Sequence, residues 1–184
     1  TAIRRAASAL RFQPVDGLEV VIRGHLGVYA PRGVYQVNTS AMEPRGMGAL
    51  QLAFEQLRDK LAKEGLFEKS RKRPLPFLPK HIGIVTSPTG AVIHDMLSVL
   101  CRRFQGIPVT LFPTIVQGNQ AVPALVEGMR VLNTLSRTPP LDVIIVGRGG
   151  GSMEDLWAFN ERIVTDAIYA CTLPVVAAIG HETD

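Results

Sequence analysis

Four short apolar runs recur in the second half of the chain, with segments of helical periodicity between them. The runs are residues 82–85, 109–112, 143–146 and 175–179. Short strands that are apolar throughout are typical of a parallel sheet with helices on both faces. The intervening segments predict helices over residues 88–104, 119–135 and 154–170, the first of them capped by Ser87. We therefore expect an α/β fold with a parallel, Rossmann-like sheet and flanking helices.

The first part of the chain has the pattern of a β-hairpin. Residues 18–29 alternate between apolar and polar side chains, a Pro-Arg-Gly turn follows at residues 31–33, and a second strand begins at Val34. Residues 48–67 then have one apolar stripe and predict a helix. We expect the domain boundary just before this helix, between a β segment of residues 1–47 and an α/β domain of residues 48–184.

Cations and aromatic side chains lie together on the predicted hairpin. They are Arg23, Tyr29, Arg32 and Tyr35. Such a mixture suits single-stranded nucleic acid, because bases stack on rings while cations follow the phosphate backbone. The alternative is a solvated hairpin face with no ligand.

The sequence Gly-Arg-Gly-Gly-Gly-Ser at residues 147–152 separates a predicted buried strand from an amphipathic segment. Glycines let the backbone approach an anion closely, and a following helix directs free N–H groups toward it. Arg148 adds a fork of donors that matches phosphate oxygens. The loop lacks the Lys-Ser/Thr end of a P-loop and does not match GxGxxG, which disfavours a nucleotide cofactor. A tight turn without a ligand is the alternative.

The loops after parallel strands meet at one edge of the sheet, where ligands bind. These loops contribute Ser87, Thr89, Gly149, Gly150, Gly151, Ser152, His181 and Asp184. We expect the hydroxyls and the glycine amides to bind a phosphate group. His181 and Asp184 share a face in a helical turn, so the aspartate could orient the imidazole. The alternative is a histidine that caps the end of a strand.

Asp95 lies among apolar residues about two turns into the first predicted helix of the α/β domain. A carboxylate in such surroundings needs a partner or a function, unless it faces solvent. Asp95, His181 and Asp184 together could hold Mg²⁺, but Arg148 at the same edge favours an anion. We therefore predict no metal site, no obligatory cofactor and at most an optional Mg²⁺ ion.

Composition sets wider limits. The 184 residues carry a formal net charge of +4, which permits a nucleic-acid partner without establishing one. Cys101 and Cys171 are expected to be buried free thiols, because no CxxC or zinc-ligand spacing is present. No apolar run approaches the roughly 20 residues that a membrane span needs. We also expect a larger protein to continue past Asp184, because polar residues directly follow the last predicted strand.

Four motifs resemble one bacterial family, the large subunit of exodeoxyribonuclease VII. They are VTSPTGA at residues 85–91, DVIIVGRGGGS at 142–152, EDLWAFN at 154–160 and GHETD at 180–184. The resemblance extends over essentially the whole chain. It implies that residues 1–47 are the end of an N-terminal, single-stranded-DNA-binding OB-fold and that residues 48–184 are most of a catalytic domain.

The resemblance also implies an activity. The family is a cytoplasmic exonuclease of DNA repair that degrades single-stranded DNA from either end to 5′-phosphate products, without a strict need for a divalent metal. Several small subunits bind a coiled-coil region that this sequence does not include. Asp95, Arg148, His181 and Asp184 match the family's proposed catalytic residues.

These expectations lead to a working hypothesis of phosphodiester hydrolysis. Arg148 and the glycine-loop amides would hold the phosphate, and His181, oriented by Asp184, would act as general acid or base. Asp95 would be a second acid or base, or a minor metal ligand. A non-catalytic, Rossmann-like module that binds a nucleotide or sugar phosphate is the alternative function.

Overall fold

The computed structural model describes residues 12–15, 18–29, 31, 33–45, 48–135 and 140–180. By its contacts the chain divides into two compact units, Thr1–Glu64 and Gly65–Asp184. This division follows the long helix that the sequence predicts, whereas the expected domain boundary precedes it. The boundary between residues 47 and 48 stays a prediction.

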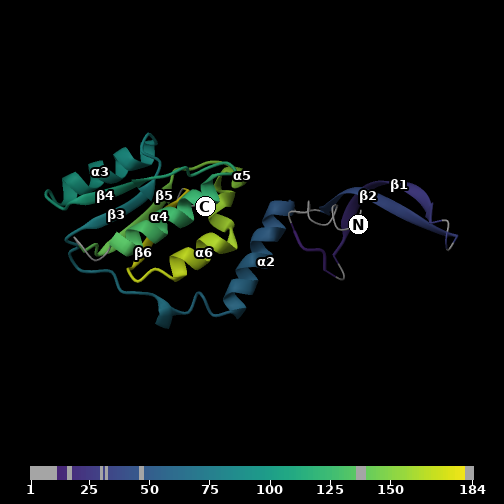
Figure 1. Ribbon diagram of the computed structural model, residues 1–184, viewed down its shortest axis with the longest axis horizontal. Helices are drawn as coiled ribbons and strands as arrows, with labels where there is room; N and C mark the ends of the chain where they lie inside the picture. Colours follow the sequence, from purple (N-terminus) through teal and green to yellow (C-terminus); the bar gives the residue numbers. More distant parts are fainter. Residues whose placement is uncertain are drawn as a thin grey trace. The chain divides into compact units, whose positions relative to one another are not determined.

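The first unit contains an antiparallel hairpin and a helix (Figure 1). These elements are β1 (Val20–Tyr29), β2 (Val34–Pro44) and α2 (Ala49–Lys63). Gly33 lies in the turn with φ +61°, a conformation that side-chain-bearing residues rarely adopt. A bulge between Arg23 and Gly24 brings β2 so close that a Cβ on Gly24 would lie 2.4 Å from the Asn38 carbonyl oxygen. The predicted hairpin and helix are confirmed.

The second unit is built on a four-stranded sheet. Its strands are β3 (Ile82–Thr86), β4 (Val109–Pro113), β5 (Val143–Arg148) and β6 (Val175–Ile179). Their order is β4-β3-β5-β6, and every neighbouring pair is parallel, which confirms the predicted α/β sheet. Strand β5 continues two residues past its expected end. Arg148 is therefore a strand residue that pairs with Ile179, and not part of the following loop.

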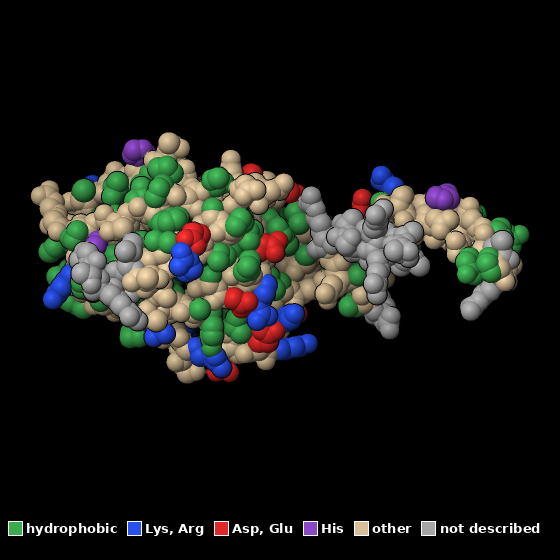
Figure 2. Space-filling model, in the orientation of Figure 1, with side chains coloured by type: hydrophobic (Ala, Val, Ile, Leu, Met, Phe, Trp, Pro, Cys, Tyr) green, Lys and Arg blue, Asp and Glu red, His purple; other side chains and the backbone are tan. Residues whose placement is uncertain are grey.

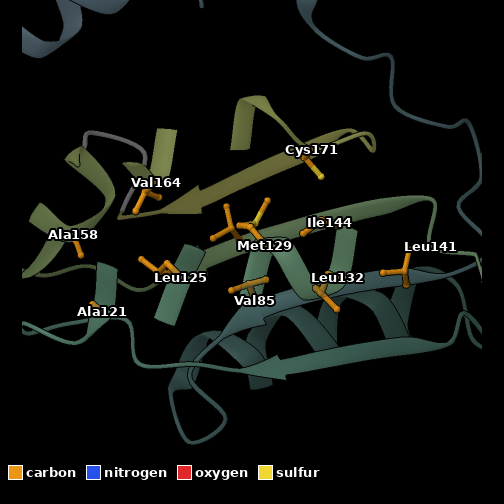
Figure 3. Close-up of a cluster of buried hydrophobic side chains, with 11 residues drawn as sticks. Val85, Ala121, Leu125, Met129, Leu132, Leu141, Ile144, Ala158, Val164 and Cys171 are labelled. Carbon is orange, nitrogen blue, oxygen red and sulfur yellow. The ribbon is translucent and has the colours of Figure 1, made fainter. Parts of the chain in front are cut away.

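Helices cover both faces of this sheet (Figure 1). They are α3 (Ala91–Arg103) on one face, and α4 (Ala121–Leu135) with α6 (Arg162–Tyr169) on the other. Ile144 and Val146 of β5 belong to the core beneath α4 and α6 (Figure 3), whereas Ile145 packs with the α3 core. Successive side chains of a strand point to opposite faces, so β5 contributes to both cores.

Helix α3 begins later than its sequence predicts. Gly90, directly before the helix, has an extended backbone with φ −76° and ψ 155°, and no side chain caps the first turn. The Ser87 hydroxyl instead lies 3.5 Å from that of Thr89. The prediction that Ser87 caps a helix starting at residue 88 is wrong, because extended backbone at Gly90 excludes residues 88–90 from the helix.

The single helix predicted over residues 154–170 is also wrong. The chain forms α5 (Met153–Leu156), the 3₁₀ helix η2 (Trp157–Asn160) and then α6. Glu161 interrupts the helical conformation with φ −89° and ψ 134°, and its carboxylate accepts a 3.0 Å hydrogen bond from Trp157 Nε1. The break lets Ala158 and Val164 both enter the core beneath α4.

The two cysteines differ in their surroundings. Cys171 is buried, and burial raises the pKa of its thiol. Cys101, expected to be buried as well, is exposed on α3. Within the described ranges, no helix combines the length and the apolarity needed to cross a membrane.

Charges of both signs are interspersed on the face of the second unit shown in Figure 2. Ion pairs in this unit include Arg130 with Glu127 at 2.6 Å and Arg162 with Asp166 at 2.8 Å. These pairs join neighbouring turns of one helix and remain exposed to solvent, where they contribute little to stability. The net positive charge of the chain therefore does not appear on this face as a uniform basic patch.

Candidate active site

The carboxyl ends of the four strands are joined to one another by hydrogen bonds. Thr114, which follows β4, donates its N–H to the Thr86 carbonyl of β3 at 3.0 Å. The Thr86 hydroxyl donates to the Gly147 carbonyl of β5 at 2.8 Å in a buried position. Gly180, after β6, donates its N–H to the Arg148 carbonyl at 3.1 Å. The predicted convergence of the strand-end loops at one edge is therefore confirmed.

Among the described residues, Arg148 is the charged residue most enclosed at this edge, with 8% of its surface exposed. Its Nη2 donates to Gln117 Oε1 at 3.0 Å and lies 3.9 Å from Asp155 Oδ2. Its Nη1 is buried and has no hydrogen-bond partner among the described residues. A buried N–H without a partner costs free energy, so this atom is suited to bind an acceptor that the protein itself does not supply.

Close packing explains two of the four glycines in the glycine-arginine loop. A Cβ on Gly147 would lie 2.5 Å from Met96 Cε, and a Cβ on Gly151 would lie 2.4 Å from Arg148 Nη1. None of the four glycines at positions 147 and 149–151 has a positive φ. A side chain at position 147 or 151 would have to displace the end of the Met96 or the Arg148 side chain, so these glycines leave room for other side chains and do not serve a left-handed turn.

Ser152 is already engaged within the protein. Its hydroxyl accepts the Asp155 N–H at 3.3 Å, and Asp155 Oδ2 accepts the Ser152 N–H at 3.3 Å, which forms a reciprocal capping box. The helix that follows, α5, has only four residues. The predicted phosphate contacts of Ser152 and of Gly149, Gly150 and Gly151 stay predictions, and an anion here would compete with this cap.

An open cleft of about 520 Å³ lies between α3 and the ends of β5 and β6. Its lining is mainly apolar and includes Asp95, Arg148, Gly149 and Gly180. Asp95 is exposed on α3 and is the carboxylate of this cleft among the described residues. The structure thus brings two of the predicted catalytic residues, Asp95 and Arg148, to one edge.

The two side chains reach that edge from opposite faces of the sheet. Gly147 faces Met96 of α3, so the next side chain, that of Arg148, points to the other face. Its partner Gln117 precedes α4, which covers that other face. A substrate held by both Asp95 and Arg148 would therefore lie across the ends of the strands.

The remaining predicted site residues are only partly placed. His181 and Asp184 lie outside the described residues, as does Arg32; Gly180, which directly precedes His181, is left-handed with φ +73°. Ser87 and Thr89 lie in the loop between β3 and α3 and are not among the residues that line the cleft. Their assignment to phosphate binding stays a prediction.

The hairpin separates two of its predicted DNA-binding residues. Tyr35 pairs with Val28 in the β1–β2 register, whereas Tyr29 pairs with Val34. Because side chains alternate along each strand, Tyr29 and Arg23 lie on one face and Tyr35 lies on the other. All three side chains are exposed. The sequence places these residues on one hairpin but does not by itself assign them to one face.

Three polar residues at this edge of the sheet were not predicted as site residues. Gln117 and Asp155 lie beside its guanidinium, and Thr114 has a buried hydroxyl without a hydrogen-bond partner in the described chain. Only their position in the segments that follow β4 and β5 could have indicated them. Within the described ranges, no group of three His, Cys, Asp or Glu side chains could hold a metal ion.

Comparison with known proteins identifies close relatives of this chain. It is 53% identical over 181 residues to the exodeoxyribonuclease 7 large subunit of Thioalkalivibrio sulfidiphilus, covering 98% of this chain and 40% of that protein. The proteins of the same name from Halothermothrix orenii and Hahella chejuensis are 54% and 55% identical, covering 95% and 94% of this chain and 42% and 38% of theirs. The chain therefore spans about two fifths of the length of these relatives.

Two family models match separate parts of the chain. The model described as an OB-fold nucleic acid binding domain matches residues 1–43, which supports the predicted OB-fold segment. The model described as exonuclease VII, large subunit, matches residues 66–184. These matches give no support to the alternative of a non-catalytic nucleotide-binding module. The chain belongs to the exonuclease VII large-subunit family.

Proposed function

We propose that this chain belongs to a nuclease that hydrolyses phosphodiester bonds of single-stranded DNA, starting from the ends of the strand. The chain comprises the last part of the OB-fold of that nuclease and most of its catalytic domain. Family membership supports the activity, and the match to a nucleic-acid-binding OB-fold supports the substrate. The alternating faces of the hairpin leave Arg23 and Tyr29 exposed together, as a single-strand-binding surface requires.

The observation that carries the proposal is the environment of the Arg148 guanidinium. The cation is held at the strand ends, is almost fully buried, and has one N–H group that no described residue satisfies. A phosphate oxygen is the acceptor that matches this donor in charge and geometry. In a site of low exposure, such a contact stabilises the charge that grows on the phosphoryl oxygens during hydrolysis.

The chemistry divides among the predicted residues as follows. A water oxygen forms a bond to phosphorus while its proton passes to a base, and the bond from phosphorus to the 3′ oxygen breaks. The leaving oxygen takes a proton, so the product carries a 5′-phosphate. Arg148 holds the phosphate, His181 transfers a proton with Asp184 orienting it, and Asp95 serves as the second acid or base.

Other parts of the assembly belong to the same proposal. The enzyme is cytoplasmic and acts in DNA repair together with several small subunits. Mg²⁺ is an optional ion and not a required one. The cationic contact from Arg148 supplies the phosphate neutralisation that a metal ion would otherwise provide.

The test uses the full-length large subunit assembled with its small subunit. Arg148→Ala is expected to lower the rate of cleavage of end-labelled single-stranded DNA by roughly 10²-fold to 10³-fold, with a smaller loss of binding. Arg130→Ala, which removes an exposed arginine on α4, is the matched control and should leave cleavage unchanged. If Arg148→Ala retains cleavage within a few-fold while binding falls, the catalytic assignment is wrong.

A further inference from the structure

Gln117 forms a direct hydrogen bond with the Arg148 guanidinium. It lies in the loop between β4 and α4, and its Oε1 accepts a 3.0 Å hydrogen bond from Arg148 Nη2. Asp155 approaches the same nitrogen only to 3.9 Å, beyond hydrogen-bond distance. The capping box with Ser152 holds the Asp155 carboxylate at that separation.

A neutral hydrogen-bond acceptor suits an arginine that must bind phosphate better than a carboxylate does. A carboxylate in direct contact would fix the guanidinium but would also neutralise its charge. An amide oxygen fixes one nitrogen without adding a second negative charge to that of Asp155, which lies 3.9 Å away. Because Gln117 engages Nη2, the buried Nη1 remains without a partner in the described chain and is available to a ligand.

From these contacts we infer that Gln117 is a positioning residue for phosphodiester cleavage, acting through Arg148. The inference rests on the proposed function of the site. The loop that carries Gln117 is itself anchored, because Thr114 donates its N–H to Thr86 and Ala121 donates its N–H to Gly118. Backbone hydrogen bonds on both sides of Gln117 therefore hold the loop from which its side chain contacts Arg148.

Gln117 is exposed, so its replacement should not disturb the fold. In the full complex with the small subunit, Gln117→Leu removes the acceptor at similar size, and Gln117→Glu keeps an acceptor but adds a negative charge. Gln120→Leu changes an exposed glutamine of the same loop whose side chain makes no hydrogen bond among the described residues; its backbone carbonyl, which accepts the Ala124 N–H, is unchanged. The measurements are kcat, KM and Tm, with end-labelled oligo-dT as the substrate.

Gln117→Leu is expected to lower kcat on the order of tenfold with KM changed by less than about threefold, because a misplaced guanidinium impairs the reacting geometry. Gln117→Glu should instead raise KM, because the introduced carboxylate competes with the phosphate for Arg148. Gln120→Leu should match the wild-type complex in all three measurements. This separation of kcat from KM is not expected of a residue that merely stabilises the loop.

Three results would overturn the inference. One is a Gln117→Leu complex whose kcat stays within twofold of wild type while Arg148→Ala is impaired; the proposed function would then stand without Gln117. The second is a loss of kcat that a lower Tm accompanies, which would show a structural role. The third is a wild-type complex that does not cleave oligo-dT, in which case the proposed function fails and this inference with it.

Discussion

At the level of single residues, the Arg148 guanidinium packs directly against Gly151. A Cβ on Gly151 would lie 2.4 Å from Arg148 Nη1, and the backbone of Gly151 is not left-handed. The absence of a side chain at position 151 therefore leaves room for the guanidinium of Arg148 and is not a requirement of the backbone conformation. The sequence predicts an arginine and glycines close to an anion, but it does not predict that the loop packs on its own arginine. Such a contact depends on tertiary packing and leaves no periodic pattern.

We predict that Gly151→Ala impairs catalysis more than stability. The added methyl group must displace the guanidinium, so cleavage of single-stranded DNA by the full complex should fall by about tenfold or more. The free energy of unfolding should fall by less than about 1 kcal/mol, because Gly151 is exposed and the added methyl group meets only the end of a flexible side chain. Denaturant unfolding and end-labelled cleavage assays measure the two effects.

Gly90→Ala provides the control for this substitution. The nearest atom to its added Cβ would be the Ser87 Cβ at 3.6 Å, an ordinary van der Waals distance, and its φ of −76° suits alanine. Both measurements should stay near the wild-type values. Wild-type cleavage by the Gly151→Ala complex would show that the position of the guanidinium is not critical.

At the level of secondary-structure elements, the two faces of the β1–β2 hairpin carry different kinds of side chain. One face carries Arg23 and Tyr29, and the other carries Tyr35 with Leu26 and Val28. On the second face, Leu26 is 77% exposed and Tyr35 is 78% exposed. A sheet face rich in exposed apolar side chains is typical of a surface that other strands of an OB-fold cover. The first face then remains for the nucleic acid.

We predict opposite effects from the two tyrosines. In the full-length complex, Tyr29→Ala should weaken binding of oligo-dT by about 1–3 kcal/mol through the loss of base stacking, with Tm little changed. Tyr35→Ala should lower Tm and leave the affinity near wild type. Fluorescence anisotropy and thermal unfolding measure the two quantities. Equal losses of affinity in both variants would contradict this assignment of the faces.

The elements differ in how far their sequences predict them. Apolar runs and turn residues correctly predict all four parallel strands and the hairpin, because burial on both faces and alternation leave direct patterns in the sequence. The helix predicted over residues 154–170 fails because its apolar spacing continues across Glu161, where the backbone becomes extended. Helix α3 starts late for a local reason, since the Ser87-Pro88 pair forms part of a turn.

For the candidate site, topology predicts more than residue chemistry does. The order of strands and helices is sufficient to place Arg148 near the edge where the strands end, and the structure adds Asp95 of α3 to the cleft at that edge. The acceptor role of Gln117 could not be predicted, because glutamine in a strand-end loop is common and its partner is 31 residues away. The sequence indicates where a site lies, whereas its internal contacts require the packed structure.

At the level of the whole molecule, the contacts and the sequence pattern place the domain boundary on opposite sides of α2. The contacts separate Thr1–Glu64 from Gly65–Asp184 and group α2 with the hairpin. The match to the exonuclease VII large subunit begins at residue 66, close to that division. The pattern of the sequence instead indicates a boundary before α2, with the predicted helix as the first element of the α/β domain.

Two shortened chains, residues 65–184 and residues 48–184, would decide between these boundaries. We expect both to unfold cooperatively, with Tm values that agree within about 3 °C, because the contacts assign α2 to the first unit. If α2 is part of the catalytic domain, its removal exposes apolar surface, and Tm of the 65–184 chain should be lower by at least about 4 °C. Circular dichroism melting of both chains at equal concentration measures the difference, and a deficit of that size would place the boundary before α2.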